Sequence, residues 1–187
     1  MEIDTPDCIK TLYGHIGGVC CLVKSVINDE QTLASSSWDK NIKLWNIQDN
    51  YNCASTLLGH KSWVLCMTKI SDSPLLISGS NDKTLIIWDI ELKTNIKTLY
   101  GHTEGIHTVI EVDNARVVSG SADTTIKIWN LLNFTCTKID NLNSHFVNCL
   151  IKLNSKNVAS GSNDNQLEFG LFSNILKDGI CYYIIIF

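Results

Sequence analysis

Histidine, serine and aspartate recur in this sequence at spacings that could build a nucleophilic site. His60, Ser78 and Asp82 form one such trio. In a hydrolase with this trio, the histidine takes the serine proton while the aspartate orients the imidazole ring. The same trio stands twice more in the same order, as His15, Ser35 and Asp39 and as His102, Ser119 and Asp123. An enzyme needs one such site, so the repetition indicates a structural device, and we predict no catalytic residue and no enzyme.

A Gly-His pair and a tryptophan complete each repeat. The Gly-His pairs recur at intervals of 45 and 42 residues: Gly14-His15, Gly59-His60 and Gly101-His102. Each aspartate stands four residues after its serine and six residues before a tryptophan, which is Trp45, Trp88 or Trp129. A period of about 40–45 residues is the length of a four-stranded β-propeller blade.

Short segments with alternating apolar residues must position these side chains. In the first repeat they run from about Val19 to Lys24, from Thr32 to Ser36 and from Asn41 to Trp45. Alternation over so few residues is typical of strands, and helical periodicity is absent. Turn-forming residues such as Ser37 and Asp39 separate the second and third segments. The sequence therefore predicts an all-β fold.

These repeats strongly resemble the WD-repeat (WD40) β-propeller family over residues 8–169. The resemblance implies blades of four-stranded antiparallel sheets. It also implies that each histidine reaches the serine of its repeat, that the serine reaches the indole N–H of the tryptophan, and that the aspartate orients the histidine. The implied network comprises His15, Ser35, Asp39, Trp45, His60, Ser78, Asp82, Trp88, His102, Ser119, Asp123 and Trp129. Such a network is physically reasonable, because a buried indole, imidazole or carboxylate is costly unless it is hydrogen-bonded.

The fourth repeat departs from the pattern. His145 follows Ser144 in place of the glycine, and Gly170 stands where the tryptophan is due, six residues after Asp164. We therefore predict a partial propeller over 1–169, an incomplete ring with three full repeats and a damaged fourth, and a divergent tail without repeat features over 170–187. The repeat ranges are about 12–55, 57–98, 99–140 and 141–169.

The first residues predict the last strand of a blade, because Cys8 to His15 resembles Asn95 to His102. In complete propellers of the family, such a strand closes the ring by pairing with the final blade. Three interpretations of the missing blades stay open: a truncated or mis-predicted gene product, a half-ring that pairs with another chain, and a small closed ring of four blades.

The family resemblance places binding surfaces just after each Gly-His pair and just before each turn aspartate. These positions are Gly18, Cys20, Trp38, Trp63, Leu65, Asn81, Gly105, His107, Ala122, Phe146, Asn148 and Asn163. We select Trp38, Trp63, Leu65 and His107 as protein-binding residues. Trp38 and Trp63 stand out because the structural pattern does not require tryptophan there, and tryptophan is enriched in interface hot spots. The alternative is that each indole packs over a neighbouring loop.

Composition narrows the function further. The net charge is −4 and Arg116 is the only arginine, so the basic stripe typical of nucleic-acid binding is missing. The apolar run from Ile180 to Phe187 is far shorter than the ~20 residues of a membrane helix. No C-x-x-C pair, phosphate-binding glycine loop or H-E-x-x-H motif occurs, so we expect no metal and no cofactor. The scattered cysteines favour a cytoplasmic location, with the nucleus as the alternative.

We therefore predict a non-catalytic scaffold that binds other proteins or peptides, within a larger complex, with no nucleic acid and no membrane as partners. The competing hypothesis is a fragment of a longer WD-repeat protein that has no activity of its own.

Overall fold

The computed structural model describes residues 8, 10–27, 30–139, 145–153, 157–162 and 181–184, and every regular element among them is a β-strand. The bounds are β1 (Val19–Ile27), β2 (Glu30–Ser37), β3 (Ile42–Asn46), β4 (Asn52–Leu57), β5 (Val64–Lys69), β6 (Leu75–Ser80), β7 (Thr84–Asp89), β8 (Thr94–Tyr100), β9 (Ile106–Asp113), β10 (Arg116–Ser121), β11 (Ile126–Asn130), β12 (Cys136–Ile139), β13 (Val147–Lys152), β14 (Asn157–Ser162) and β15 (Cys181–Ile184). They form four sheets, here called blades 1 to 4: β1–β4, β5–β8, β9–β12 and β13–β15.

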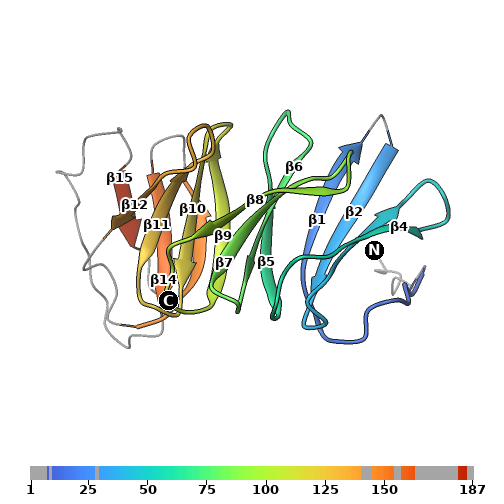
Figure 1. Cartoon of the computed structure of the whole chain (residues 1–187), viewed down its shortest axis with the longest axis horizontal. Coiled ribbons are helices and arrows are strands. Elements are labelled where there is room, and N and C mark those ends of the chain that lie inside the picture. The colour runs from blue at the N-terminus through green and yellow to red at the C-terminus, as the bar shows by residue number, and fades with distance from the viewer. Residues whose placement is uncertain are drawn as a thin grey trace, which may run out of the picture.

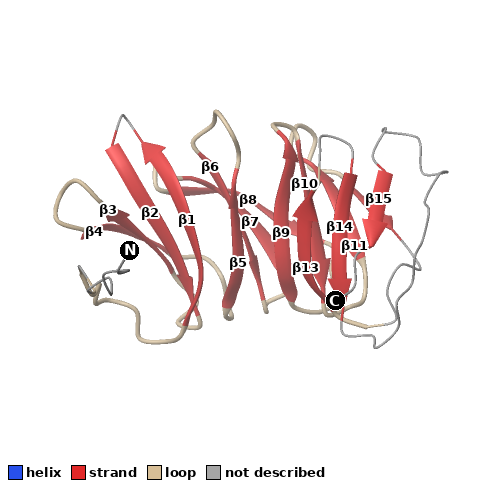
Figure 2. Cartoon of the chain, turned by 180° about the vertical axis from the view of Figure 1, so that it is seen from behind, coloured by secondary structure: helices blue, strands red, loops and turns tan. Residues whose placement is uncertain are grey.

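Blades 1 to 3 are antiparallel meanders in which each strand pairs with the next one along the chain. Figure 1 shows blade 1 at the right, blade 2 in the middle, and blades 3 and 4 overlapping at the left. The view from behind shows the same row (Figure 2). Within the described part of the chain the row does not close into a ring. The predicted all-β fold with three complete antiparallel blades is confirmed.

Buried clusters between neighbouring blades hold the row together. Trp88 of blade 2 lies in one cluster with Leu44 of blade 1, and Trp129 of blade 3 lies in one with Ile87 of blade 2. Side chains alternate between the two faces of a strand, so every blade presents one apolar face to each neighbour. The tryptophan one residue before the end of the third strand is therefore a central part of the packing between blades.

One face of blade 1 has no neighbour in the described structure. Val19 and Leu22 on β1 are 54% and 60% exposed. Their counterparts on β5, Val64 and Met67, are 0% and 5% exposed because blade 1 covers them. The outward face of blade 1 therefore carries the same apolar pattern as an interface between blades, but it is open.

Among the described residues blade 4 has three strands instead of four, in line with the damaged fourth repeat that the sequence predicts. It contains β13 and β14 in antiparallel pairing, followed by β15, which pairs with β14 in parallel. The strand β15 comes from the 170–187 segment, for which the sequence predicted no repeat feature, and its parallel direction departs from the pattern of blades 1 to 3. Asp164 and Gly170 lie outside the described residues.

The predicted strand at Cys8 to His15 is wrong for the part of it that is described. Residues 8 and 10–15 are assigned to no strand. The resemblance to Asn95 to His102 reflects the sequence of an outer strand, and the counterpart segment does belong to β8. A strand needs a partner for its backbone groups, and β8 has β7 beside it. No described strand pairs with the first segment, so its sequence alone does not make it a strand.

Candidate functional site

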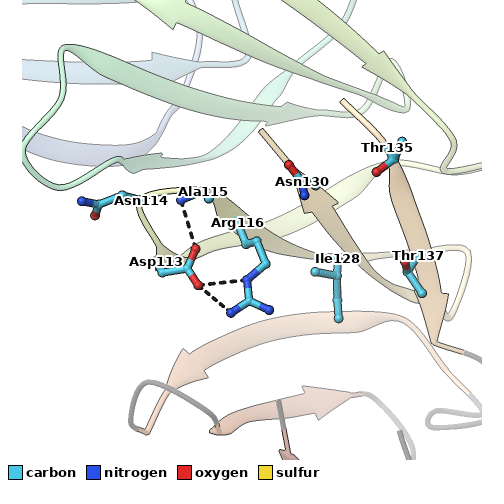
Figure 3. Close-up of a pocket in the computed structure, with 8 residues that line it drawn as sticks. All are labelled: Asp113, Asn114, Ala115, Arg116, Ile128, Asn130, Thr135 and Thr137. Carbon is cyan, nitrogen blue, oxygen red and sulfur yellow. Dashed lines mark hydrogen bonds and ion pairs between the residues drawn. The ribbon is translucent and has the colours of Figure 1, made fainter. Parts of the chain in front are cut away.

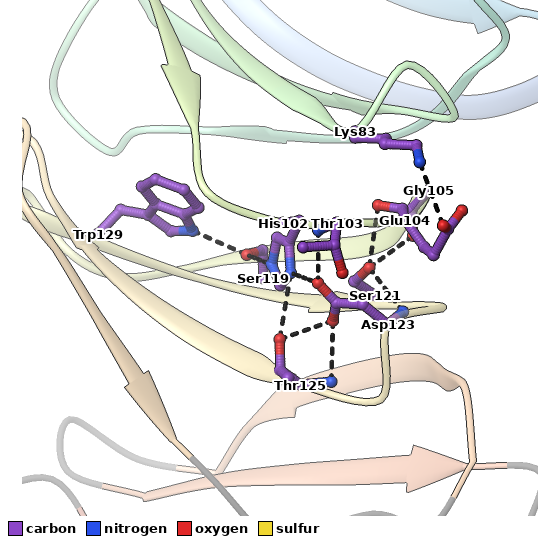
Figure 4. Close-up of polar contacts among 10 residues, drawn as sticks. All are labelled: Lys83, His102, Thr103, Glu104, Gly105, Ser119, Ser121, Asp123, Thr125 and Trp129. Carbon is purple, nitrogen blue, oxygen red and sulfur yellow. Dashed lines mark hydrogen bonds and ion pairs between the residues drawn. The ribbon is translucent and has the colours of Figure 1, made fainter.

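A hydrogen-bonded chain of four side chains lies in each complete blade. In blade 3, Trp129 Nε1 donates to Ser119 Oγ at 2.7 Å, and Ser119 Oγ lies 2.8 Å from His102 Nε2. His102 Nδ1 lies 2.8 Å from Asp123 Oδ2 (Figure 4). With the ring proton on Nδ1, the serine hydroxyl donates to Nε2, and every group has a partner. The sequence-predicted bonds are therefore all present in this blade.

Blades 1 and 2 repeat the chain with nearly the same distances. The indole-to-serine distances are 2.8 Å for Trp45 and Ser35 and 2.7 Å for Trp88 and Ser78. The remaining contacts, between serine and histidine and between histidine and aspartate, span 2.7–2.8 Å and involve His15 with Ser35 and Asp39, and His60 with Ser78 and Asp82. All twelve residues of the predicted network thus take the positions that the repeat assigns to them.

The aspartates are held ionised. Burial raises the pKa of the Asp123 carboxyl, but hydrogen bonds from Thr125, Thr103 and His102 outweigh it and lower the pKa to about 2. Asp82 behaves in the same way: hydrogen bonds from His60, Thr84 and the Lys61 backbone overcome burial and bring its pKa below the ordinary range. Hydrogen bonds to the charged form of a carboxylate are the cause in both.

The network cannot work as a catalytic triad. Burial lowers the pKa of His102, more than the neighbouring Asp123 raises it, so the ring is neutral at pH 7. Ser119 is fully buried and already accepts the indole N–H. A nucleophile must reach a substrate, and this hydroxyl reaches only its own blade. The repeated trio therefore serves to pin the turn and the third strand of the blade.

Threonine side chains donate hydrogen bonds to two of the turn aspartates. The reasoning from sequence did not identify these threonines. Thr84 Oγ1 and Thr125 Oγ1 each donate to the turn aspartate of their blade at 2.6 Å. Blade 1 has Asn41 at this position, and there only the backbone N–H donates, to Asp39 Oδ1 at 3.0 Å. The signal in the sequence is a threonine two residues after the aspartate.

Six of the predicted binding positions lie on one rim, because the same backbone contact recurs in each complete blade. The residue before the turn aspartate donates its N–H to the residue before the first strand of its blade, at 2.9 Å in each case. The pairs are Trp38 with Gly18, Asn81 with Trp63, and Ala122 with Gly105. We call this set of positions, together with Phe146, the rim. Asn163 lies outside the described residues.

Trp38 and Trp63 stack on each other across the boundary between blades 1 and 2. Their ring centroids are 5.1 Å apart and their planes differ by 27°. They are 50% and 47% exposed. A Cβ at Gly18 would lie 3.2 Å from the Trp38 ring, so glycine lets the indole lie flat against the chain. Each indole thus packs on a neighbour and still presents about half of its surface to solvent.

Polar side chains lie next to the rim at the other two blade boundaries. Lys83 Nζ lies 3.1 Å from Glu104 Oε1 between blades 2 and 3. His107 meets Phe146 edge-on at 6.1 Å, and its Nδ1 lies 3.3 Å from Asn148 Oδ1.

The four selected binding residues do not form one patch. Leu65 is half-buried within β5. The structure brings Trp38 and Trp63 into direct contact. His107 lies two interfaces away, between blades 3 and 4, where it meets Phe146.

No metal centre is found among the described residues, since no three histidine, cysteine, aspartate or glutamate side chains cluster there. In that same part of the chain, no helix is long and apolar enough to cross a membrane.

The similarity to known proteins coincides with the three repeats. Residues 6–46, 51–89 and 93–130 match the family described as WD domain, G-beta repeat. An uncharacterized WD repeat-containing protein of Schizosaccharomyces pombe is 35% identical over 113 residues, which cover 58% of this chain and 30% of that protein. Coatomer subunit beta'-2 of Arabidopsis thaliana is 38% identical over 86 residues, covering 43% of this chain and 9% of the subunit.

Solved structures show the same architecture. The structure of U3-55K superposes with a TM-score of 0.68 at 25% identity, over 75% of this chain and 44% of that one. The chain thus spans less than a third of the length of either curated relative and under half of the solved structure. Because the family matches cover more than half of the residues and the blades carry the hydrogen-bonded network, the chain belongs to the WD40 (WD domain, G-beta repeat) family.

Proposed function

We propose that this protein is a non-catalytic scaffold that captures other proteins or peptides on its rim, with the Trp38–Trp63 stack as the main contact. The observation that carries the proposal is the half-exposed indole pair at the blade 1–blade 2 boundary. Stacked indoles offer a large, rigid apolar surface, and binding to it costs little side-chain entropy. WD40 propellers generally act as protein-interaction domains, and similarity to a coatomer subunit supports a place within a larger assembly.

The proposal also fits the charge of the chain. With a net charge of −4 and a single arginine that is paired with Asp113, the surface has little to offer a phosphate backbone. We therefore propose proteins as partners, with neither nucleic acid nor membrane among them. We further propose a cytoplasmic location, with the nucleus as the alternative, which fluorescence microscopy of a tagged chain in the source cell would decide.

Quantitative affinity capture tests the binding role. The chain, the Trp38→Ala variant and the Trp63→Ala variant would each be used as bait in lysate from the source cell. We expect either variant to weaken capture of the same partners about 30-fold, the equivalent of a ~2 kcal/mol hot spot. Leu92→Ala is the matched control, because Leu92 is an exposed apolar residue in the turn after β7 and lies off the rim. Equal capture by all four baits would rule out the indole pair.

The open face of blade 1 supports a second proposal, that another chain packs against it and extends the row of blades. Val19 and Leu22 are the exposed counterparts of residues that are buried in blade 2. Leu22→Lys should then turn an assembly into a monomer in analytical ultracentrifugation. A chain that is monomeric with or without the change would contradict this proposal. A chain that stays insoluble until further repeats are supplied would favour the fragment interpretation over both proposals.

A further inference from the structure

Blade 4 contains a buried hydroxyl, that of Ser160, without a hydrogen-bond partner. Ser160 pairs with Leu150 in the same register in which Ser119 pairs with Val109 and Ser78 with Met67. Those two serines accept an indole N–H at 2.7 Å. Ser160 is 4% exposed, and its Oγ has no hydrogen-bond partner. An unsatisfied buried hydroxyl is costly, so this position favours an incoming donor.

The face of blade 3 that packs toward blade 4 is also incompletely buried. Ile128 of blade 3 precedes the tryptophan of its strand, as Leu44 and Ile87 do in blades 1 and 2. Leu44 and Ile87 are almost fully buried, whereas Ile128 is only partly buried. The cluster between blades 3 and 4 contains no tryptophan, while the other two clusters contain Trp88 and Trp129.

A cavity of about 740 Å³ lies beside Ile128, and all its described lining residues belong to blade 3 (Figure 3). The corresponding space beside Leu44 measures only about 250 Å³, because Ile90 and its neighbours in the β7–β8 turn of blade 2 enter it. Figure 3 shows Ile128 pointing toward the ribbon of blade 4. The missing volume therefore corresponds to the third strand and following turn of a complete fourth blade.

The strand that occupies the third position does not supply the missing group. β15 pairs with β14 over four residues and in parallel, with Val158 opposite Tyr182 and Ala159 opposite Tyr183. Its sequence, Cys-Tyr-Tyr-Ile, contains no tryptophan. Parallel pairing is slightly less stable per residue than antiparallel pairing, so a longer antiparallel strand would compete well for the same edge.

We propose that blade 4 is an acceptor site for a β-strand of another polypeptide. The incoming strand runs antiparallel to β14, displaces β15, places a tryptophan beside Ile128 and donates its indole N–H to Ser160. Backbone pairing at the sheet edge gives affinity, and the tryptophan gives specificity. The partner is thus an extended segment of the Asp-x-x-x-x-x-Trp type that forms the third strand in this chain's own blades. The site is independent of the Trp38–Trp63 stack.

A labelled peptide with the sequence of residues 123–130, Asp-Thr-Thr-Ile-Lys-Ile-Trp-Asn, tests the proposal. We expect it to bind the full chain saturably in fluorescence anisotropy. The same peptide with 1-methyltryptophan, which keeps the ring but lacks the N–H, should bind about two- to tenfold more weakly, the equivalent of one hydrogen bond. On the Ser160→Ala variant the two peptides should bind equally. The methylated peptide needs no protein variant, so the test does not depend on how that variant folds.

Displacement of β15 has a separate test. Replacing both Tyr182 and Tyr183 with proline removes backbone donors from β15 and should raise the affinity for the tryptophan peptide. No saturable binding, or equal binding of both peptides to the unmodified chain, would overturn the acceptor site. Unchanged or weaker binding to the double proline variant would overturn the displacement of β15.

Discussion

The indole of Trp38 in blade 1 lies on the indole of Trp63 in blade 2, with ring centroids 5.1 Å apart and planes 27° apart. The two residues belong to different sheets, so the stack joins two blades at their rim. Because both rings stay about half exposed, the pair contributes to packing and also offers a surface to a partner.

The stack should be measurable as a coupling between the two residues. Offset aromatic pairs contribute about 0.5–1.5 kcal/mol beyond their buried area. A double-mutant cycle with Trp38→Ala and Trp63→Ala, followed by urea denaturation, should give a coupling energy in that range. Leu92→Ala combined with Trp38→Ala provides the control, and those two changes should be additive. A coupling energy near zero for the indole pair would show that the rings do not interact in solution.

Removing a turn aspartate should destabilise its blade. Asp82→Ala leaves the ring N–H of His60 and the backbone N–H of Lys61 without their shared acceptor. We expect a loss of about 1–3 kcal/mol in the free energy of unfolding. Glu91→Ala, at an exposed acidic residue in the next turn, should leave the free energy of unfolding unchanged. Chemical denaturation monitored by tryptophan fluorescence makes the comparison, and equal stability of the two variants would contradict the structural role of Asp82.

Two serines in equivalent positions should respond oppositely to the same substitution. Ser119→Ala removes the acceptor of the Trp129 indole and should cost about 1–3 kcal/mol of stability. Ser160→Ala removes a buried hydroxyl that has no partner, so the free energy of unfolding should stay the same or rise slightly. Thermal melts of both variants test this contrast. A comparable loss for Ser160→Ala would mean that this hydroxyl is bonded in solution.

Adjacent threonines in blade 3 should also respond oppositely. Thr124 has a φ of 68°, a left-handed conformation that is unfavourable for a β-branched residue. Thr124→Asn should therefore raise stability by about 0.5–1 kcal/mol, because asparagine tolerates this region better. Thr125→Val removes the hydroxyl that donates to Asp123 at 2.6 Å and should lower stability. Differential scanning calorimetry of both variants would show the opposite signs, and a lower melting temperature for Thr124→Asn would contradict the strain at this turn.

Stability should fall as the solution becomes acidic. Burial holds the pKa of His102 below its usual value, so the unfolded chain binds this proton at a higher pH than the folded chain. Stability is then fully present above about pH 6.5 and falls as the pH drops below it. The pKa of Asp123 is lowered to about 2, which adds a second loss between about pH 4 and pH 2.

Melting temperatures measured from pH 7.5 to pH 3 test the sign of this dependence. The fall between pH 7 and pH 5 should become smaller in the His102→Gln variant, which has no imidazole to protonate. A melting temperature that rises on acidification would contradict both pKa shifts.

The sequence by itself determined the content of each blade. Alternation of apolar residues placed the strands near β1, β2 and β3, and the structure extends the first of them to Ile27. The tryptophan of a blade lies two residues beyond the residue that pairs with the serine on the neighbouring strand, so their hydrogen bond follows from local pairing. The network residues could be named for the same reason, because the repeat itself carries the pattern.

Tertiary structure decided what depends on the neighbours of a blade. The sequence placed Trp38 and Trp63 on exposed positions, but only the packing of blade 1 on blade 2 brought the two rings together. The tertiary structure also showed that Ser160 lacks a hydrogen-bond partner, because such a partner depends on which strand pairs with β14. The first segment failed as a strand for a related reason: Cys8 to His15 has an outer-strand sequence, but a strand forms only where another strand offers its backbone groups. The residue pattern of each repeat determines the blade itself. Contacts between blades determine which outer strands form and which side chains at the blade boundaries find a partner.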